Sequence, residues 1–169
     1  EKQVNDLGDF KQAERQMEDL WDENVESLAT LDIMKALVDL NINQLMDNDK
    51  AAKYYARWLE ENESDPLYKE YTLKLYDHYM DVMKDGQKAL RLLQDYVKDH
   101  PISLETLDIE LKLAKTSLSL VRNSIADGMP EDFFSIDLTS CYEHLGFIIG
   151  EEMNEDVVDE IFSKFCMGK

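Results

Sequence analysis

The chain has 169 residues, which is enough for one hydrophobic core or two very small ones. Hydrophobic residues make up 44% of it, with only 6 Gly and 3 Pro, so the composition favours a folded helical protein over a disordered or an all-β one. The net charge is −19, from 37 acidic and 18 basic residues. Because nucleic acids are bound largely through Lys and Arg, this surface argues against direct binding of a nucleic acid and leaves a basic partner, a cation or simple solubility.

Cysteine content and hydropathy bear on the compartment. The two cysteines, Cys141 and Cys166, do not make a disulfide framework. The sequence has no signal peptide and no apolar run long enough to span a membrane. We therefore expect a cytoplasmic protein that does not associate with a membrane.

The first hundred residues carry helical patterns separated by turn signals. Apolar residues between Phe10 and Met46 recur at three- and four-residue steps, which predicts one long helix or two with a break near Thr30. The run 47–49, Asp-Asn-Asp, supplies a turn and a cap for a short helix over 51–59. Ser64-Asp65-Pro66 predicts the start of a long helix that ends near residue 99, in which Gly86 marks either a close helix approach or a kink.

His100-Pro101 interrupts the helical pattern, because the residue before a proline disfavours the α region. After it, a heptad pattern predicts a helix over 103–128 that ends at Gly128. Its apolar positions are Leu104, Leu107, Leu111, Ala114, Leu118, Val121 and Ile125. A further helix over 130–150 ends at Gly150, and Asn154 caps a last one whose apolar stripe is Val157, Val158, Ile161, Phe162 and Phe165.

These patterns predict an all-α fold, a bundle of mostly antiparallel helices with three long and two or three short ones. We find no internal repeat. The segments 1–100 and 101–169 are expected to pack in one core.

The C-terminal residues resemble a known family. The resemblance is carried by Ile136-Asp137-Leu138, Leu145-Gly146, Gly150-Glu151, Glu155-Asp156, Ile161-Phe162-Ser163 and the final Phe165-Cys166-Met167-Gly168-Lys169. Over about residues 104–169 the chain resembles the C-terminal half of the helical domain of MnmE, the bacterial and organellar GTPase that modifies the wobble uridine of certain tRNAs. That family ends in Phe-Cys-x-Gly-Lys. Residues 1–100 carry no such resemblance.

The resemblance implies a non-catalytic helical scaffold domain of an MnmE-like enzyme, without the GTPase and folate domains. The sequence itself has no phosphate-binding loop, so we expect no enzymatic activity and no cofactor in this chain. The partners that the resemblance implies are the GTPase and folate domains, a second subunit in a homodimer, and the FAD-dependent protein MnmG. The alternatives are a free-standing acidic helical interaction module, or an artificial fusion of residues 1–100 to an MnmE-like tail.

Cys166 is the one candidate for chemistry. The resemblance implies that it takes part in tRNA modification, with Phe165, Gly168 and Lys169 in the same binding tail. Lysines beside a thiol favour its thiolate form, which is the reactive one. The alternative is a small buried hydrophobe that anchors the tail.

Two further groups of side chains are candidates for binding. Tyr54, Tyr55, Trp58 and Tyr71 belong to a tyrosine-rich face that suits either a protein interface or core packing. Cys141 and His144 are three residues apart, a spacing that can hold a soft metal. Because two ligands do not close a tetrahedral site, we predict no metal site, a core cysteine and a partly exposed histidine.

Overall fold

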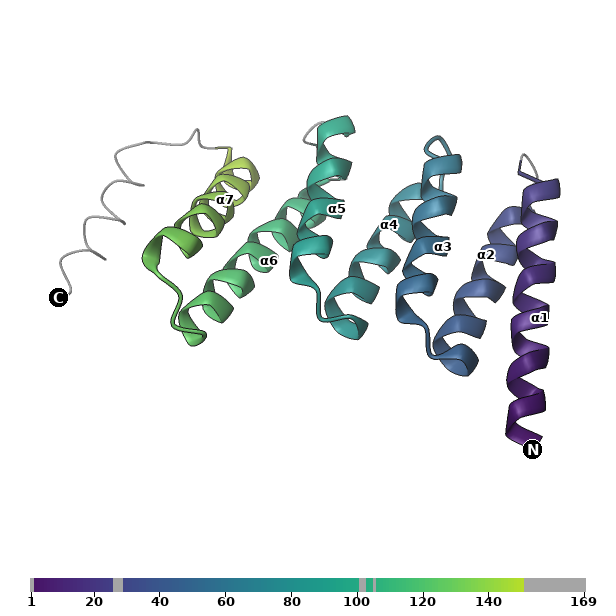
Figure 1. Cartoon of the computed structure of the whole chain (residues 1–169). Coiled ribbons are helices and arrows are strands. Elements are labelled where there is room, and N and C mark those ends of the chain that lie inside the picture. The colour runs from purple at the N-terminus through teal and green to yellow at the C-terminus, as the bar shows by residue number, and fades with distance from the viewer. Residues whose placement is uncertain (1, 26–28, 101–102, 105, 151–169) are drawn as a thin grey trace. The chain divides into compact units, whose positions relative to one another are not determined.

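The computed structural model describes residues 2–25, 29–100, 103–104 and 106–150, and every regular element within them is helical (Figure 1). The predicted all-α fold is therefore confirmed. The α helices are α1 (Lys2–Glu23), α2 (Ala29–Leu40), α3 (Asn48–Glu61), α4 (Tyr68–Asp77), α5 (Gly86–Asp99), α6 (Leu107–Ala126) and α7 (Glu131–Ile149). Two π-helical turns accompany them, η1 (Asn41–Leu45) and η2 (His78–Val82).

The chain divides into two compact units. Unit 1 is Glu1–Lys84 and unit 2 is Asp85–Lys169. The division thus falls between Lys84 and Asp85, and His100 and Pro101 both belong to unit 2.

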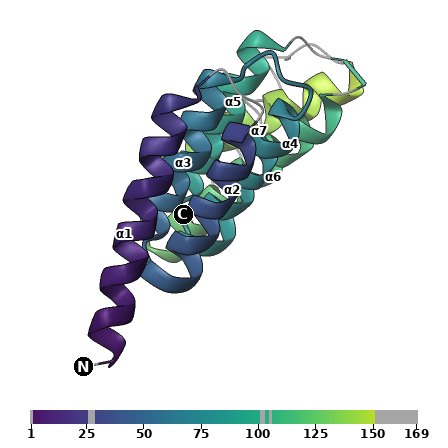
Figure 2. The same ribbon diagram turned by 90° about the vertical axis from the view of Figure 1, so that its right-hand side faces the viewer.

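Unit 1 contains α1 to α4. Of the two alternatives for residues 10–46, the one with two helices is confirmed, because α1 ends at Glu23 and α2 begins at Ala29. The first turns of α1 extend past the neighbouring helices of the unit (Figure 2). Its other end is anchored, since Trp21 is fully buried. The largest fully buried hydrophobic side chains of the unit are Trp21, Trp58, Met34, Leu37 and Leu75.

The prediction of one long helix from residue 64 to residue 99 is wrong. Asp65 forms the turn before a helix, because its carboxylate accepts a hydrogen bond from the backbone N–H of Leu67 at 2.8 Å, and the helix begins at Tyr68 with Leu67 as its N-cap. That helix, α4, ends at Asp77 and passes through η2 to Lys84, which has a positive φ of 56°. Gly86 is the first residue of α5, so it marks a helix start and not a kink within one helix.

The turns after α2 and after α4 have the same backbone design. Each continues into a π turn, then a residue with positive φ, Met46 at 54° or Lys84 at 56°. An aspartate follows as the N-cap, and its side chain accepts from the backbone N–H three residues later, at 2.9 Å for Asp47 and 3.0 Å for Asp85. Asp47 and Asp85 therefore cap α3 and α5 in the same way.

Unit 2 contains α5, α6 and α7. The predicted stop of α6 at Gly128 is confirmed: Gly128 has φ 69°, and its N–H bonds the Ile125 carbonyl at 3.1 Å. The N–H of Met129 bonds the Ser124 carbonyl at 2.9 Å, which completes a Schellman motif. Gly150 likewise ends α7 with φ 72°.

The heptad pattern of α6 marks its buried face only in part, because Ala114 and Val121 of that pattern are buried but other positions are not. Ile109 and Leu113 are fully buried, whereas Leu111, Leu118 and Ile125 are each more than half exposed. The periodicity predicted this helix, but α6 begins at Leu107 and not at residue 103, and α5 and α7 cover only some of its apolar side chains. The predicted last helix, from Asn154 onward, lies outside the described residues.

Candidate functional site

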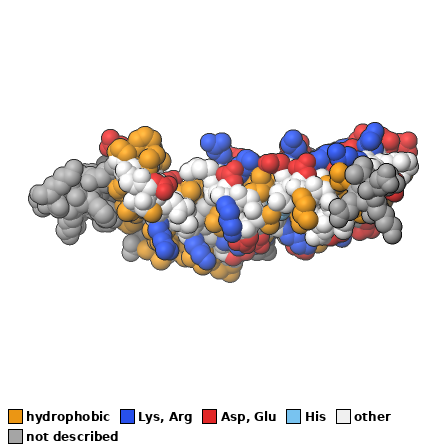
Figure 3. Space-filling view, turned by 60° about the horizontal axis from the view of Figure 1, so that its bottom comes forward, with side chains coloured by type: hydrophobic (Ala, Val, Ile, Leu, Met, Phe, Trp, Pro, Cys, Tyr) orange, Lys and Arg blue, Asp and Glu red, His pale blue; other side chains and the backbone are white. Residues whose placement is uncertain are grey.

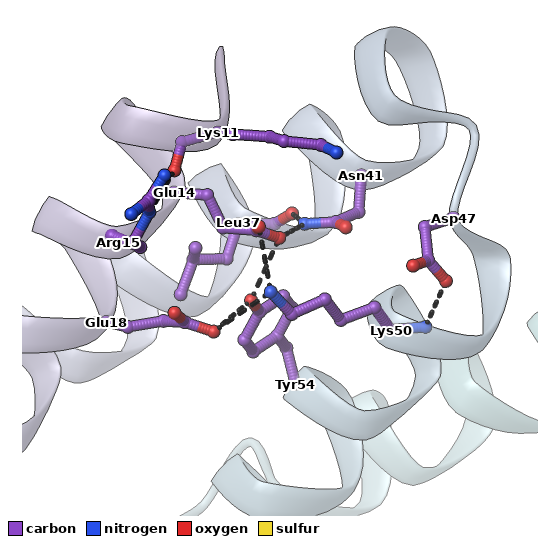
Figure 4. Close-up of polar contacts among 9 residues, drawn as sticks. All are labelled: Lys11, Glu14, Arg15, Glu18, Leu37, Asn41, Asp47, Lys50 and Tyr54. Carbon is purple, nitrogen blue, oxygen red and sulfur yellow. Dashed lines mark hydrogen bonds and ion pairs between the residues drawn. The ribbon is translucent and has the colours of Figure 1, made fainter. Parts of the chain in front are cut away.

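A buried carboxylate, Glu14 of α1, is the centre of a polar cluster in unit 1 (Figure 4). Its Oε1 accepts hydrogen bonds from Asn41 Nδ2 at 2.7 Å and from the Tyr54 hydroxyl at 3.1 Å. Its Oε2 pairs with Lys50 Nζ at 2.8 Å. Glu18, one turn further along α1, contacts the same Lys50 at 3.2 Å and the Tyr54 hydroxyl at 2.6 Å. The cluster thus ties α1 to η1 and α3.

The charges of this cluster are mutually stabilised. Burial by itself would raise the pKa of Glu14, but hydrogen bonds from Lys50, Asn41 and Tyr54, with the charge of Lys50, lower it below its ordinary value. Burial would lower the pKa of Lys50, but hydrogen bonds and charge from Glu14 and Glu18 raise it. Burial and the two carboxylates raise the pKa of the Tyr54 hydroxyl, so it stays a donor. A protonated lysine between two carboxylates is a structural arrangement, because no member is held in a reactive form.

Local backbone geometry places the amide of Asn41. Asn41 is the first residue of η1 and is fully buried, and its Nδ2 also donates to the Leu37 carbonyl at 2.9 Å. Sequence reasoning missed Glu14, Asn41 and Lys50. The only signal was a pair of glutamates, Glu14 and Glu18, four residues apart and therefore on one helix face.

The tyrosine-rich candidates lie mostly inside unit 1. Tyr54, Trp58 and Tyr71 are buried, and Tyr55 is half-buried. The rings of Trp58 and Tyr71 have centroids 5.0 Å apart, and those of Tyr55 and Tyr71 are 6.4 Å apart. The structure therefore brings Tyr55, Trp58 and Tyr71 together between α3 and α4, whereas Tyr54 faces α1, where its ring lies 6.3 Å from that of Trp21. Core packing accounts for the three buried residues.

A second buried polar contact lies in unit 2. His144 Nδ1 on α7 is 2.7 Å from Glu110 Oε2 on α6, and both side chains are buried. His144 was expected to be partly exposed, which is wrong, because the carboxylate of Glu110 gives the ring a partner inside the core. Cys141 is buried as expected, and burial raises the pKa of its thiol, which makes the thiol inert.

The candidate tail residues Phe165, Cys166, Gly168 and Lys169 lie outside the described residues. Within the part of the chain that is described, no three His, Cys, Asp or Glu side chains gather closely enough to hold a metal ion. None of the described helices is both long and apolar enough to cross a bilayer.

Comparison with known proteins identifies one matching family. The profile of the MnmE helical domain matches residues 68–166, which begins with α4. The match therefore includes residues 68–100, where the sequence motifs showed no resemblance. No solved structure matches the chain significantly.

Curated relatives match a shorter part. The chain is 62% identical over 56 residues to a protein named tRNA modification GTPase MnmE from Lachnoclostridium phytofermentans, which covers 33% of this chain and 12% of that protein. Proteins of the same name from Acholeplasma laidlawii and a Picosynechococcus species are 48% identical over 60 residues and 51% identical over 59 residues. These alignments cover 36% and 35% of this chain and 13% of each relative. The chain thus matches about an eighth of the relatives' length.

Proposed function

Because the chain belongs to the MnmE helical domain family, we propose that it is the helical scaffold of an MnmE-like tRNA-modifying GTPase and does no chemistry on GTP itself. The match over residues 68–166 carries this proposal. The relatives that are named tRNA modification GTPase MnmE align with 56 to 60 residues of this chain, and the one from Lachnoclostridium phytofermentans is 62% identical over 56 residues.

The polar groups of the described residues support a scaffold. The buried carboxylates Glu14 and Glu110 each have a close partner, Lys50 and His144, at 2.8 and 2.7 Å. Buried polar pairs of this kind link neighbouring helices through their hydrogen bonds. On this proposal the catalytic domains belong to other chain segments or partners, and the helices hold them.

We assign the contact with the reaction to the C-terminal tail. Cys166 is the candidate residue, and Phe165, Gly168 and Lys169 would position it, as the resemblance implies. The thiol of Cys141 is not a candidate, because burial raises its pKa and so disfavours the reactive thiolate form. The partners proposed are the GTPase and folate domains, a flavoprotein of the MnmG kind, and a second subunit.

A graft tests the proposal. The segment of the Lachnoclostridium phytofermentans protein that aligns with this chain is replaced by the corresponding residues of this chain. The chimera is then expressed in a bacterium that lacks its own MnmE, and modified wobble uridine is measured by mass spectrometry of the tRNA. We expect modification to be restored.

Two cysteine variants sharpen the test. Cys166→Ser in the chimera should abolish most of the modification, while the matched Cys141→Ala should keep it. A chimera that folds, judged by circular dichroism, but modifies no tRNA would contradict the scaffold role. GTP hydrolysis by the purified chain above a boiled control would contradict its non-catalytic nature.

Residues 1–67 favour a second, separate function. They lie outside the family match, yet the core of unit 1 is built largely from them, including the fully buried Trp21, Leu37 and Trp58. We propose that this part is an acidic module that binds a protein with a basic surface. Binding to an immobilised basic protein that survives the removal of residues 151–169 would support it. If the full chain bound no basic protein from the bacterium used for the graft, this second function would be contradicted.

A further inference from the structure

His144 is the last buried residue of α7. It is 8% exposed, whereas residues 145–150, all of which the structure describes, are half-buried or exposed. The exposed apolar side chains among them are Leu145, Phe147 and Ile149, at 43%, 48% and 67%. Figure 3 shows hydrophobic side chains at the surface in the α6–α7 part of the molecule. Because so little apolar area is buried beyond His144, hydrophobic burial stabilises the last turns of α7 only weakly.

Glu110, the partner of His144, lies near the start of α6. It is the fourth residue of that helix and is 2% exposed. Residues 127–130 join the end of α6 to the start of α7, so the 2.7 Å contact between Glu110 Oε2 and His144 Nδ1 links the two helices at the end that is remote from their connection. The connecting turn cannot hold α7 on α6 there. The polar contact therefore carries a larger share of the packing at this end than at the other.

The first two thirds of α7 have apolar anchors. Phe134 and Cys141 of α7 are buried, as are Ala114 and Val121 of α6. These side chains give α7 hydrophobic packing up to Cys141, about one turn before His144. Loss of one partner of a buried hydrogen bond leaves the other unpaired in the core, which costs more than the loss of an exposed contact. The last turns of α7 should thus respond to a loss of the polar contact much more strongly than the first turns.

We propose that the contact between Glu110 and His144 is a clasp that holds residues 145–149 of α7 on α6. With the clasp closed, α7 continues to Gly150, which ends it with φ 72° and with an N–H that bonds the carbonyl four residues earlier. With the clasp open, the last turns of α7 lose their hold on α6 and the helix ends near His144. This inference rests on the proposed function in one respect, which is that Glu110 and His144 are then positioning residues for the tail that carries Cys166.

Hydrogen exchange of the α7 amides in the full chain tests the clasp, measured residue by residue by NMR. Glu110→Leu keeps most of the side-chain volume and removes the acceptor for His144. Glu110→Gln keeps an acceptor, because the amide oxygen can take the place of Oε2. The matched control is Cys141→Ala, which alters another buried residue of α7 and leaves the clasp in place.

We expect Glu110→Leu to speed the exchange of amides 146–150 about tenfold, the effect of losing one buried hydrogen bond, and that of amides 135–141 less than about threefold. Glu110→Gln should restore the rates of amides 146–150, and Cys141→Ala should not speed them more than those of amides 135–141. Equal acceleration along α7 by Glu110→Leu would overturn the proposal, since the variant would then weaken the whole unit. Unchanged rates, or a loss that Glu110→Gln does not restore, would overturn it too.

Modification of tRNA tests the positioning role. The chimera is built with residues 104–169 of this chain, which include both residues of the clasp, and modified wobble uridine is measured by mass spectrometry. Glu110→Leu should lower the modification about tenfold or more, and Glu110→Gln should restore it. An active chimera that Glu110→Leu leaves unchanged would overturn the positioning role. If the chimera with Glu110 in place modifies no tRNA, the proposed function fails, while hydrogen exchange still decides the clasp.

Discussion

Replacing Glu14 by glutamine tests whether the polar cluster stabilises unit 1. The amide keeps an oxygen that can accept from Asn41 and Tyr54, but its NH2 group replaces the oxygen that pairs with Lys50 Nζ, so the change removes the charge and the contact with Lys50. A hydrogen bond to a charged group contributes about 1.5–3 kcal/mol and a neutral one about 0.5–1.5. Lys50 is 33% exposed, so solvent screening reduces the stabilisation that its ion pair with Glu14 contributes. Lys50 also keeps its second partner, Glu18, at 3.2 Å. We expect Glu14→Gln to lower the free energy of unfolding by about 1–2 kcal/mol.

Tryptophan fluorescence in urea measures this loss. The two tryptophans of the chain, Trp21 and Trp58, are both buried in unit 1, so the transition reports that unit. The control is Glu60→Gln, because Glu60 is exposed on α3 and its loss should change the stability by less than about 0.5 kcal/mol. Equal shifts of the urea midpoint for the two variants would refute the reasoning.

The pH dependence gives a second check on Glu14. Because the pKa of Glu14 is lower in the folded state than in the unfolded state, the stability that its charge contributes is fully present above the unfolded-state pKa. It is lost as the pH falls through the folded-state pKa. The free energy of unfolding of the wild-type chain should therefore approach that of Glu14→Gln as the pH falls below about 4.3, the ordinary pKa of glutamate. A difference that is constant from pH 7 to pH 3 would mean that the charge of Glu14 contributes nothing.

Three further changes probe the helix ends and the core of unit 2. Asp85→Ala removes the cap of α5 and should cost about 1 kcal/mol, measured by the loss of helical circular dichroism in urea; no change would mean that the cap is dispensable. Gly128→Ala should cost about 1–2 kcal/mol in the same assay, because φ is 69° there although the space is open; a stabilised variant would contradict this. Glu110→Ala leaves His144 buried without its carboxylate and should speed hydrogen exchange of the α6 amides about tenfold or more, whereas Lys115→Ala, at an exposed position of the same helix, should change it little.

Local signals in the sequence predicted the helix ends well. Asp47 caps α3, Gly128 ends α6 and Gly150 ends α7, as expected. Each of these features depends on hydrogen bonds or backbone angles within a few residues, so the residue type alone is informative. The all-α class followed in the same way from helical periodicity and from the low content of glycine and proline.

The interruption between α4 and α5 could not be found in this way. The apolar pattern continues from residue 68 to residue 97, and Gly86 was consistent with one continuous helix. The chain turns at Lys84, a non-glycine residue with positive φ, and the cap of Asp85 becomes visible only when that turn is known. A periodic pattern shows that a segment is helical, but it does not show whether one helix or two carry it.

The sequence by itself determined the helical class, most helix ends and the resemblance of the C-terminal residues to MnmE, because each depends on neighbouring residues or on a local motif. Only the tertiary structure decided which side of α6 is buried and which polar groups meet. Glu14 reaches Asn41 and Tyr54 across 27 and 40 residues of sequence. Such contacts depend on how the helices pack, and many packings satisfy the same hydrophobic pattern. The exposure of Leu111, Leu118 and Ile125 on α6 follows from this, since periodicity marks apolar positions but not the residues that cover them.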